Sequence, residues 1–429
     1  MFSFKKVIGN IDTSKDLILL LIIGGLYSLS IALSNTFVNV YLWKQSGEFF
    51  DLGLYNLAVV VMQPITFILA GRLAKKIDRV LVLRLGVSSL AIFFITVLVI
   101  GENASQFLIL LGGILGVGYG FYWLAFNVLT FEITEPDTRD FFNGFLGILS
   151  SFAGMVGPIL AGFIIHSMKE FTGYTVIFGI SLALFAGAVV LSFFLKRRKA
   201  EGNFMFRRII KERANNYNWK MVTNAHFFQG LREGTFIFVI TVFVFIETGS
   251  ELALGKFGLV NSGVSFLAYY IATRVIKKDF RKKSILLGGL LVYAAIFLIL
   301  FDVSYAKLIT YAVVIAIGYP FLLVPYVSLT YDVIGKGWKA AEMRIEYIVV
   351  RELFLNLGRI VSILGFLSAV SFFDEKKSIP ILLAIVGAGH AVIYFFIRKI
   401  KFDHDNQDAI RSKSYSKTKL IEGDGGSTA

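Results

Sequence analysis

The sequence predicts an all-α integral membrane protein with twelve transmembrane helices arranged in two six-helix halves. Of its 429 residues, 56% are hydrophobic and 17% are charged, which is more apolar surface than a soluble chain buries. The apolar runs are long and continuous, whereas the strands of a membrane barrel are short and alternate. Similar sequence recurs about 200 residues later, so the two halves are expected to be structural repeats.

The internal repeat lies in three segments. Residues 118–133 (GYGFYWLAFNVLTFEI) recur as 318–333 (GYPFLLVPYVSLTYDV), and residues 71–79 (GRLAKKIDR) recur as 273–281 (TRVIKKDFR). The same shift of 202 places Leu52-Gly53 onto Leu254-Gly255. Three matches in one order indicate a repeated membrane unit, which is typical of secondary transporters.

Each predicted span is an apolar run near the roughly 20 residues that cross the hydrocarbon core. The first run is too long for a signal-peptide core and is therefore expected to remain as the first span. The first half has its spans at 17–43, 50–70, 81–100, 106–131, 141–166 and 174–195. The second half has them at 221–246, 256–273, 284–302, 306–331, 345–371 and 379–397.

A basic stretch, 196–220, separates six spans from six and begins with the sequence KRRK. We therefore expect an N-terminal half at 1–195, a cytoplasmic linker at 196–220 with a short surface helix, and a C-terminal half at 221–400. The segment 401–429 is polar and is expected to be a disordered cytoplasmic tail.

The placement of charge predicts the orientation. Of the 43 Lys and Arg residues, three lie deep inside predicted spans, and only six lie in the loops or at the span ends of one side: Lys44, Lys169, Lys256, Lys307, Lys376 and Lys377. All the others lie on the second side, which the positive-inside rule makes cytoplasmic, together with both termini. We expect a multi-pass protein of the bacterial plasma membrane.

The net charge of +14 follows from this topology and from anionic lipids, so no nucleic-acid partner is expected. The sequence has no Cys and four scattered His, so no metal site and no cofactor are expected. We expect a monomer among membrane lipids.

Twelve spans, the six-plus-six split and the basic central loop resemble the major facilitator superfamily, over nearly the whole chain up to about residue 400. The loop 71–79 resembles the family pattern Gly-x-x-x-Asp-x-x-Gly-Arg-Lys. Gly71 and Arg79 match this pattern, whereas Lys75 replaces its acid and Asp78 its second glycine. The fifth span, with Gly154, Gly157-Pro158 and Gly162, is similar to an element of drug and metabolite exporters in the family.

An acid and an arginine recur at the cytoplasmic ends of spans four and ten. Glu132 and Arg139 match a Glu-x6-Arg pattern of the family, and Asp332 is the repeat of Glu132. A carboxylate facing a loop arginine can form a latch that opens in one conformation; ordinary interfacial charges are the alternative. The expected cytoplasmic gate consists of Gly71, Asp78, Arg79, Glu132, Arg139, Arg281 and Asp332.

Charged residues inside the hydrocarbon region are costly, and they gather in spans seven and eleven. Span seven carries Arg232 and Glu233, and span eleven carries Arg351, Glu352 and Arg359. Three cations against two acids suit an anionic substrate, or a glutamate that exchanges a proton beside its arginine. A static ion-pair network is the alternative. Glu233, Arg351, Glu352 and Arg359 form the predicted coupling or charge network, with Glu233 as the coupling residue.

In the family, spans 1, 4, 7 and 10 line the central cavity, which implies the substrate pathway of this chain. Its aromatic residues can stack on a cyclic ligand while their polar tips bind it, although lipid-facing filler is the alternative for any single ring. The implied pathway residues are Asn35, Asn39, Tyr119, Tyr122, Trp123, Asn127, Gln229, Arg232, Tyr319 and Tyr326.

These features predict a secondary active transporter that moves a small or amphipathic solute by alternating access. Proton-coupled export is the favoured mode, with protons as the candidate coupling ion. A lipid flippase or a uniporter of the same fold is the alternative. A polytopic membrane enzyme is less favoured, because the external loops are short and histidines are sparse. The sequence has no ATP-binding loop of the Gly-x4-Gly-Lys-Ser/Thr type, so ATP is not the expected energy source.

Overall fold

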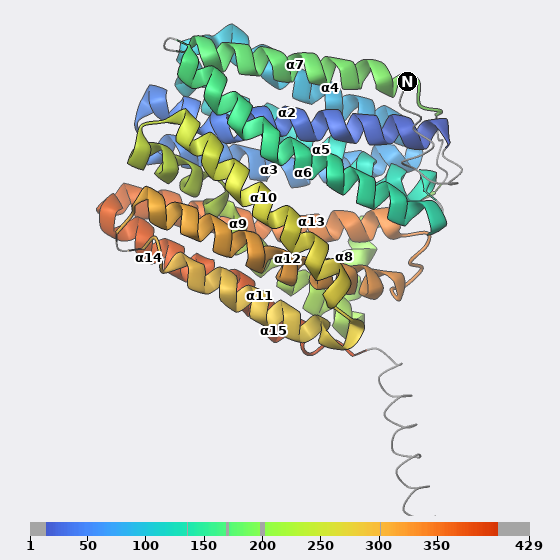
Figure 1. Ribbon diagram of the computed structural model, residues 1–429. Helices are drawn as coiled ribbons and strands as arrows, with labels where there is room; N and C mark the ends of the chain where they lie inside the picture. Colours follow the sequence, from blue (N-terminus) through green and yellow to red (C-terminus); the bar gives the residue numbers. More distant parts are fainter. Residues whose placement is uncertain (1–13, 135, 169–170, 198–201, 301, 402–429) are drawn as a thin grey trace, which may run out of the picture.

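The protein is a bundle of long helices, seen in a computed structural model that describes residues 14–134, 136–168, 171–197, 202–300 and 302–401. These residues form helices and turns and no strand. Figure 1 shows the first six spans gathered in one half of the bundle and the last six in the other. The predicted all-α membrane fold is confirmed.

The first half begins at Ser14, whose hydroxyl caps the first helix by accepting a hydrogen bond from the backbone N–H of Leu17 (3.2 Å). The helix ends at Gly47, whose φ of 69° suits a residue without a side chain. A 3₁₀ segment, η1 (Gly101–Phe107), joins the third helix to the fourth. The helices are α2 (Lys15–Ser46), α3 (Phe49–Lys76), α4 (Arg79–Ile100), α5 (Leu108–Ile133), α6 (Pro136–Ser167) and α7 (Thr172–Ser192).

The second half repeats this order, and its first helix ends at Gly249, with φ of 58°. Gly249 lies 202 residues after Gly47, so the repeat also extends to a helix end. The helices are α9 (Tyr217–Thr248), α10 (Glu251–Val275), α11 (Arg281–Ile296), α12 (Tyr305–Gly335), α13 (Arg344–Phe372), α14 (Glu375–Gly387) and α15 (Gly389–Ile397), with a 3₁₀ turn, η2 (Lys278–Phe280), before α11.

Two predicted spans differ from the observed helices. The run 284–302 leaves α-helical geometry at Ile296, and Phe297, Leu298 and Ile299 then bond three residues back, as in a tighter 3₁₀ turn. The last span is divided at Ala388 into α14 and α15. Both departures occur inside apolar sequence, where hydropathy carries no signal of backbone geometry.

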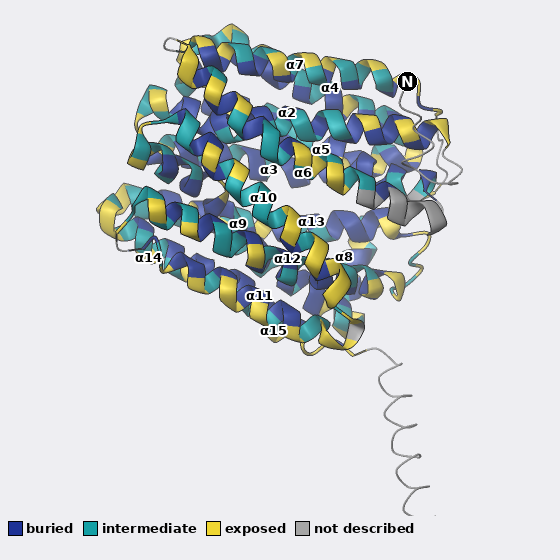
Figure 2. Ribbon diagram, viewed as in Figure 1, coloured by how far each residue is buried: buried dark blue, intermediate teal, exposed yellow. Residues whose placement is uncertain are grey.

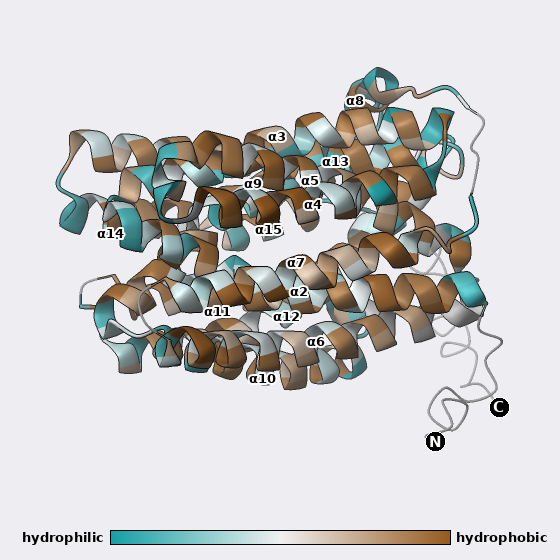
Figure 3. Cartoon of the chain, turned by 90° about the horizontal axis from the view of Figure 1, so that it is seen from above, coloured by the Kyte–Doolittle hydropathy of each residue, from teal (hydrophilic) through white to brown (hydrophobic). Residues whose placement is uncertain are grey.

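Hydropathy agrees with a membrane protein. Among the described residues, nine segments are long and apolar enough to cross a membrane, one of which runs through α4, η1 and α5 and another through α14 and α15. α10 and α11 are outside this set, and α11 has only 16 residues. Figure 3 shows hydrophobic residues along the helix bodies and hydrophilic ones near several helix ends and α8.

The bundle has one end that we call the basic side. It holds the start of α2, the junction of α3 with α4, and α8 (Phe206–Asn215), at the right in Figure 1. α8 lies inside the predicted linker and packs on α9, because the indole N–H of Trp219 donates to the carbonyl of Ile209 (3.2 Å). The predicted tail, 402–429, lies outside the described residues.

The two halves meet chiefly along two helix pairs, α3 with α13 and α6 with α10. Small residues let these helices approach closely. A β-carbon at Gly53 would lie 2.7 Å from the Leu367 side chain, and one at Gly258 would lie 2.7 Å from Pro158. In the fifth span, Pro158 and Gly162, where a β-carbon would meet the carbonyl oxygen of Glu251, therefore lie at the contact between halves.

The helices that carry the buried charges, α9 and α13, cross closely within the second half. A β-carbon at Gly234 would lie 2.6 Å from the carbonyl oxygen of Arg359, and one at Gly358 would lie 2.7 Å from the backbone nitrogen of Leu231. Because backbone atoms cannot move aside like a side chain, these two glycines determine the distance between the charged faces.

We expect Gly358→Ala to lower the melting temperature of the detergent-purified protein, since its methyl group would meet the backbone of α9. Overpacking of this kind costs about 1–3 kcal/mol. Gly179→Ala is the control, because a β-carbon at Gly179 meets nothing within 4 Å. Equal melting temperatures for the two variants would contradict the close crossing.

Candidate functional site

A cavity of about 530 Å³ lies between the two halves. Its two walls differ in chemistry, since amide and aromatic side chains face it from the first half and charged ones from the second. The first wall includes Tyr27, Asn35, Asn39, Asn56, Gln63, Tyr119, Trp123 and Asn127; the second includes Tyr331, Arg351, Glu352 and Arg359. Such a cavity can hold a solute that has both a polar and a charged part.

The amide wall is pre-arranged by hydrogen bonds between α2, α3 and α5. The Asn56 amide donates to the side-chain oxygen of Asn39 (2.9 Å) and to the Leu52 carbonyl (2.8 Å). The Tyr119 hydroxyl donates to the side-chain oxygen of Asn35 (3.1 Å). These bonds hold the amide groups in place before a solute enters.

The aromatic residues of the first half form a stack that ends at the cavity. The rings of Tyr27 and Tyr122 are parallel, with centroids 3.9 Å apart, and Trp123 meets Tyr27 edge to face at 5.3 Å. Tyr122 is fully buried, whereas Trp123 is 37% exposed and lines the cavity. Trp123 is therefore the ring available for stacking, and Tyr122 supports the stack from behind.

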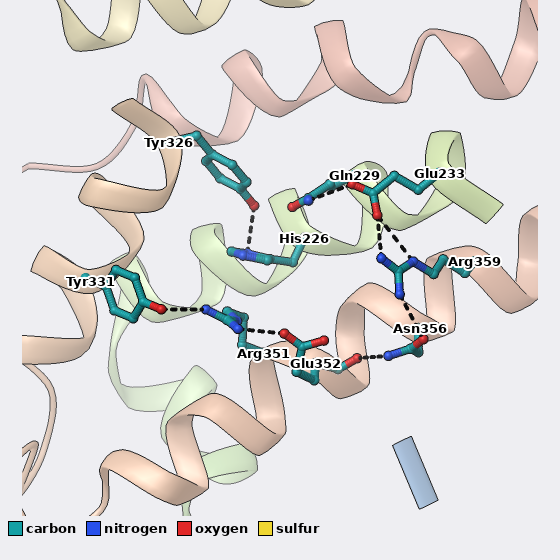
Figure 4. A network of polar contacts seen from close by, with 9 residues as sticks. All are labelled: His226, Gln229, Glu233, Tyr326, Tyr331, Arg351, Glu352, Asn356 and Arg359. Carbon is teal, nitrogen blue, oxygen red and sulfur yellow. Dashed lines mark hydrogen bonds and ion pairs between the residues drawn. The ribbon is translucent and has the colours of Figure 1, made fainter. Parts of the chain in front are cut away.

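The centre of the charged wall is an ion pair between α9 and α13 (Figure 4). Arg359 donates to one carboxylate oxygen of Glu233 through both Nη2 (2.6 Å) and Nε (3.2 Å). The second oxygen accepts from the Gln229 amide (2.8 Å) and the Tyr319 hydroxyl (3.1 Å). Four donor contacts stabilise the ionised form of this carboxylate in the membrane.

A second pair, Arg351 with Glu352 (2.6 Å), continues the network along α13. The Asn356 side chain lies between the two pairs, accepting from Arg359 (3.4 Å) and donating to the backbone carbonyl of Glu352 (3.0 Å). Tyr331 extends the network to α12 by accepting from Arg351 (3.4 Å). The polar contacts therefore connect residues of α9, α12 and α13 (Figure 4).

The surplus cation expected from three arginines against two acids is Arg232. Glu352 pairs with Arg351, and Glu233 pairs with Arg359. Arg232 is buried and is not among the residues that line the cavity. Its guanidinium donates to the Tyr311 hydroxyl (3.4 Å) and lies 4.6 Å from the ring centroid of Phe236. A cation–π contact partly replaces the missing carboxylate.

The other predicted pathway residues lie at different depths. Gln229 and Tyr319 bond to Glu233, and none of the three is among the residues that line the cavity; Glu233 is joined to the wall through Arg359. Tyr326 is fully buried, with its hydroxyl 2.7 Å from Nδ1 of His226. Asn56 and Gln63, which the sequence reasoning missed, are seven residues apart on one face of an apolar helix, a pattern that could have revealed them.

The predicted gate residues form two equivalent ion pairs, one in each half. Arg79 lies 2.7 Å from Glu132, and Arg281 lies 2.8 Å from Asp332. Each pair joins neighbouring helices of the same half, α4 with α5 and α11 with α12. Asp78 caps α4 by accepting from the backbone N–H groups of Val80 (2.7 Å) and Leu81 (3.3 Å). The side chain of Arg139 lies outside the described residues.

The contact that joins the halves on the basic side is an ion pair between Lys75 and Glu346. Both residues are buried. Lys75 also donates to the Glu342 carbonyl (2.9 Å), and Glu346 accepts from the backbone N–H of Met205 (3.1 Å). Gly71 lies one turn away, where a β-carbon would be 3.0 Å from Val349. Lys75 thus replaces the acid of the family pattern, and the carboxylate with which it pairs lies in the other half.

A second ion pair joins the halves at the opposite side. Lys44, at the end of α2, lies 2.8 Å from Glu251, at the start of α10. The Tyr174 hydroxyl donates to the same oxygen of Glu251 (3.0 Å). The Lys44 ammonium also lies 5.3–5.8 Å from the ring centroids of Phe171, Tyr174 and Phe245. The central cavity therefore lies between two ionic contacts that cross from half to half.

We expect Glu346→Gln to destabilise the purified protein by about 3–5 kcal/mol, because it leaves the Lys75 ammonium buried without a carboxylate. Glu342→Gln is the matched control, since its exposed partner Lys339 is 3.2 Å away and such pairs contribute at most about 1 kcal/mol. The double variant Lys75→Glu/Glu346→Lys should recover most of the loss. Thermal unfolding measures all three, and a swap that fails to rescue would contradict direct pairing.

Comparison with known proteins agrees with this architecture. The sequence profile of the Major Facilitator Superfamily matches residues 20–363. The chain is 65% identical to the protein YqgE of Bacillus subtilis (strain 168), over 99% of this chain and 100% of that protein. It is also 61% identical over 207 residues to a protein from the sodM 3' region of Geobacillus stearothermophilus, covering 48% of this chain and 97% of that protein.

Solved structures share the fold at low sequence identity. The human organic anion transporter MFSD10 (TETRAN) superposes with a TM-score of 0.65 and 15% identity, covering 89% of this chain and 98% of that one. A point mutant of the nucleoside transporter NupG superposes with a TM-score of 0.67 and 14% identity, covering 90% and 100%. The chain is therefore a multi-pass membrane transporter that belongs to the Major Facilitator Superfamily.

Proposed function

We propose that the protein is a secondary active transporter that carries a small amphipathic organic anion by alternating access. The observation that supports this most is the central cavity, placed between two halves that are ion-paired at both of its ends. Opening one ionic contact while the other stays closed would expose the cavity to one side at a time. ATP has no part in this cycle.

The chemistry of the walls supports the substrate class. Arg351 and Arg359 line the cavity, and two carboxylates balance them. An anionic group can compete with Glu352 or Glu233 for these guanidiniums, which favour bidentate anion recognition. Trp123 and the amide groups on the facing wall can then bind a ring and its polar substituents. Proteins of the same fold include one described as an organic anion transporter and one as a nucleoside transporter.

Proton coupling through Glu233 is part of the proposal. A protonated Glu233 would lose its charge attraction to Arg359, which would free that guanidinium to bind an anionic solute. Loss of the proton would restore the pair and expel the solute. Under this scheme the proton and the solute occupy the site together, so both move in the same direction, as in a symporter. The proton-coupled export expected from the sequence would instead require the solute to bind only when Glu233 is ionised. A uniporter or lipid flippase is the alternative, in which the pair stays closed as a structural link.

We further propose that the basic side is cytoplasmic, in the plasma membrane of a bacterium. The chain has no cysteine, so single cysteines report their position without background. We expect Lys376→Cys, which is exposed at the start of α14, to react with a membrane-impermeant maleimide in intact cells. Lys211→Cys, exposed on α8, should react only after the membrane is opened. The reverse pattern would invert the topology.

The coupling role is tested in proteoliposomes. A thermal-shift screen with organic anions and nucleosides first identifies a solute that raises the melting temperature, and its radiolabelled form is then followed. We expect Glu233→Gln to abolish pH-gradient-driven transport while keeping solute exchange at equal pH. Glu247→Gln, an exposed carboxylate on the same helix, should transport as the unmodified protein does.

If Glu233→Gln keeps full gradient-driven transport, Glu233 is not the coupling residue. The uniporter would then be the favoured mechanism. Loss of both transport and exchange, with a lower melting temperature, would assign the pair a structural role. In that case Glu233→Arg/Arg359→Glu should restore stability.

A further inference from the structure

A groove of about 560 Å³ opens on the surface of the second half, and it shares no residue with the central cavity. The end of α10 forms one edge, α11 forms the centre and α12 the other edge. Most of its lining is apolar and exposed, including Val275, Leu287, Leu291 and Ile317. In Figure 2, exposed residues are visible along α10 and α11 on this half.

The floor of the groove offers an occupant no polar partner. The hydroxyl of Ser284 already donates to the carbonyl of Phe321 (2.6 Å). Gly288 has no side chain, and a β-carbon there would lie 2.6 Å from the backbone nitrogen of Leu322, so α11 and α12 are close together beneath the groove. A molecule bound in the groove therefore contacts apolar groups along the floor.

The length of the groove fits one leaflet of a bilayer. Its lining runs along the chain from Phe280, just before α11, to Leu291, which at about 1.5 Å per residue is roughly 16 Å. The hydrocarbon core of a membrane is about 30 Å thick. A groove that begins at the basic side thus ends near the middle of the membrane, where acyl chains of that leaflet also end.

The basic-side mouth of the groove is cationic. Lys283 lines it and is exposed, with its ammonium 5.6 Å from the ring centroid of Phe280. No described carboxylate forms an ion pair with Lys283, and the neighbouring Asp332 is held by Arg281. Arg274 and Lys277 are exposed nearby in the sequence, against Asp279. This charge is complementary to an anionic headgroup.

We propose that this groove binds one anionic phospholipid of the basic-side leaflet, with an acyl chain along α11 and its headgroup phosphate on Lys283. The apolar floor, which is as long as one leaflet is deep, matches the acyl chain of such a lipid, and the cation at the open end matches its headgroup. A protein partner or a second copy would need polar contacts at its rim, whereas a lipid chain needs none.

The test is native mass spectrometry of the full-length protein titrated with phosphatidylglycerol, and with phosphatidylcholine of the same acyl chains. We expect tighter binding of phosphatidylglycerol. Lys283→Ala should weaken it about fivefold, the effect of one lysine near an anionic headgroup. Ile317→Trp, which fills the groove from its exposed wall, should remove the tightly bound lipid.

Two controls keep the result specific. Leu267→Trp places the same bulk on an exposed position of α10 outside the groove, and Lys211→Ala removes a basic-side charge on α8. Both should bind phosphatidylglycerol as the unmodified protein does, and all variants should share its melting temperature in detergent. Equal binding of the two lipids, or unchanged binding in Ile317→Trp, would overturn the proposal.

Discussion

The cost of an unpaired charge in hydrocarbon is the constraint on which the arrangement of this protein depends. Hydrocarbon offers these groups no hydrogen bonds, so each ionised side chain needs a partner within the chain or the cavity. Glu233 and Glu352 meet this need with Arg359 and Arg351, and Asn356 accepts a further hydrogen bond from Arg359. The same need draws α9 and α13 together, and Gly234 and Gly358 allow them to approach closely enough. The buried ion pairs and the close crossing of α9 and α13 therefore depend on each other.

The halves are related in sequence but differ in their role at the cavity. The repeat-related pairs Arg79–Glu132 and Arg281–Asp332 each join neighbouring helices within one half. The pairs that cross between halves, Lys44–Glu251 and Lys75–Glu346, are not related by the repeat. Two separate ionic contacts between the halves, one at each end of the cavity, suit a rocking motion about a central site.

Much of the fold could be predicted from the sequence, because apolar length and the positions of basic loops are local properties. The partners of the charges could not, since Lys75 and Glu346 are 271 residues apart and Lys44 and Glu251 are 207 apart. Hydropathy also missed Asn56 and Gln63, whose polarity is outweighed by the apolar residues around them. Identifying Arg232 as the surplus cation required the three-dimensional pairing of both glutamates.

The polarity of the Lys75–Glu346 pair has an evolutionary consequence. The family pattern that the loop 71–79 resembles has an acid at the position of Lys75, and in this chain an acid there would meet the buried carboxylate of Glu346. A single exchange of sign at either position would place two like charges in contact. Such a chain would be disfavoured by several kcal/mol. The two positions are therefore expected to change together.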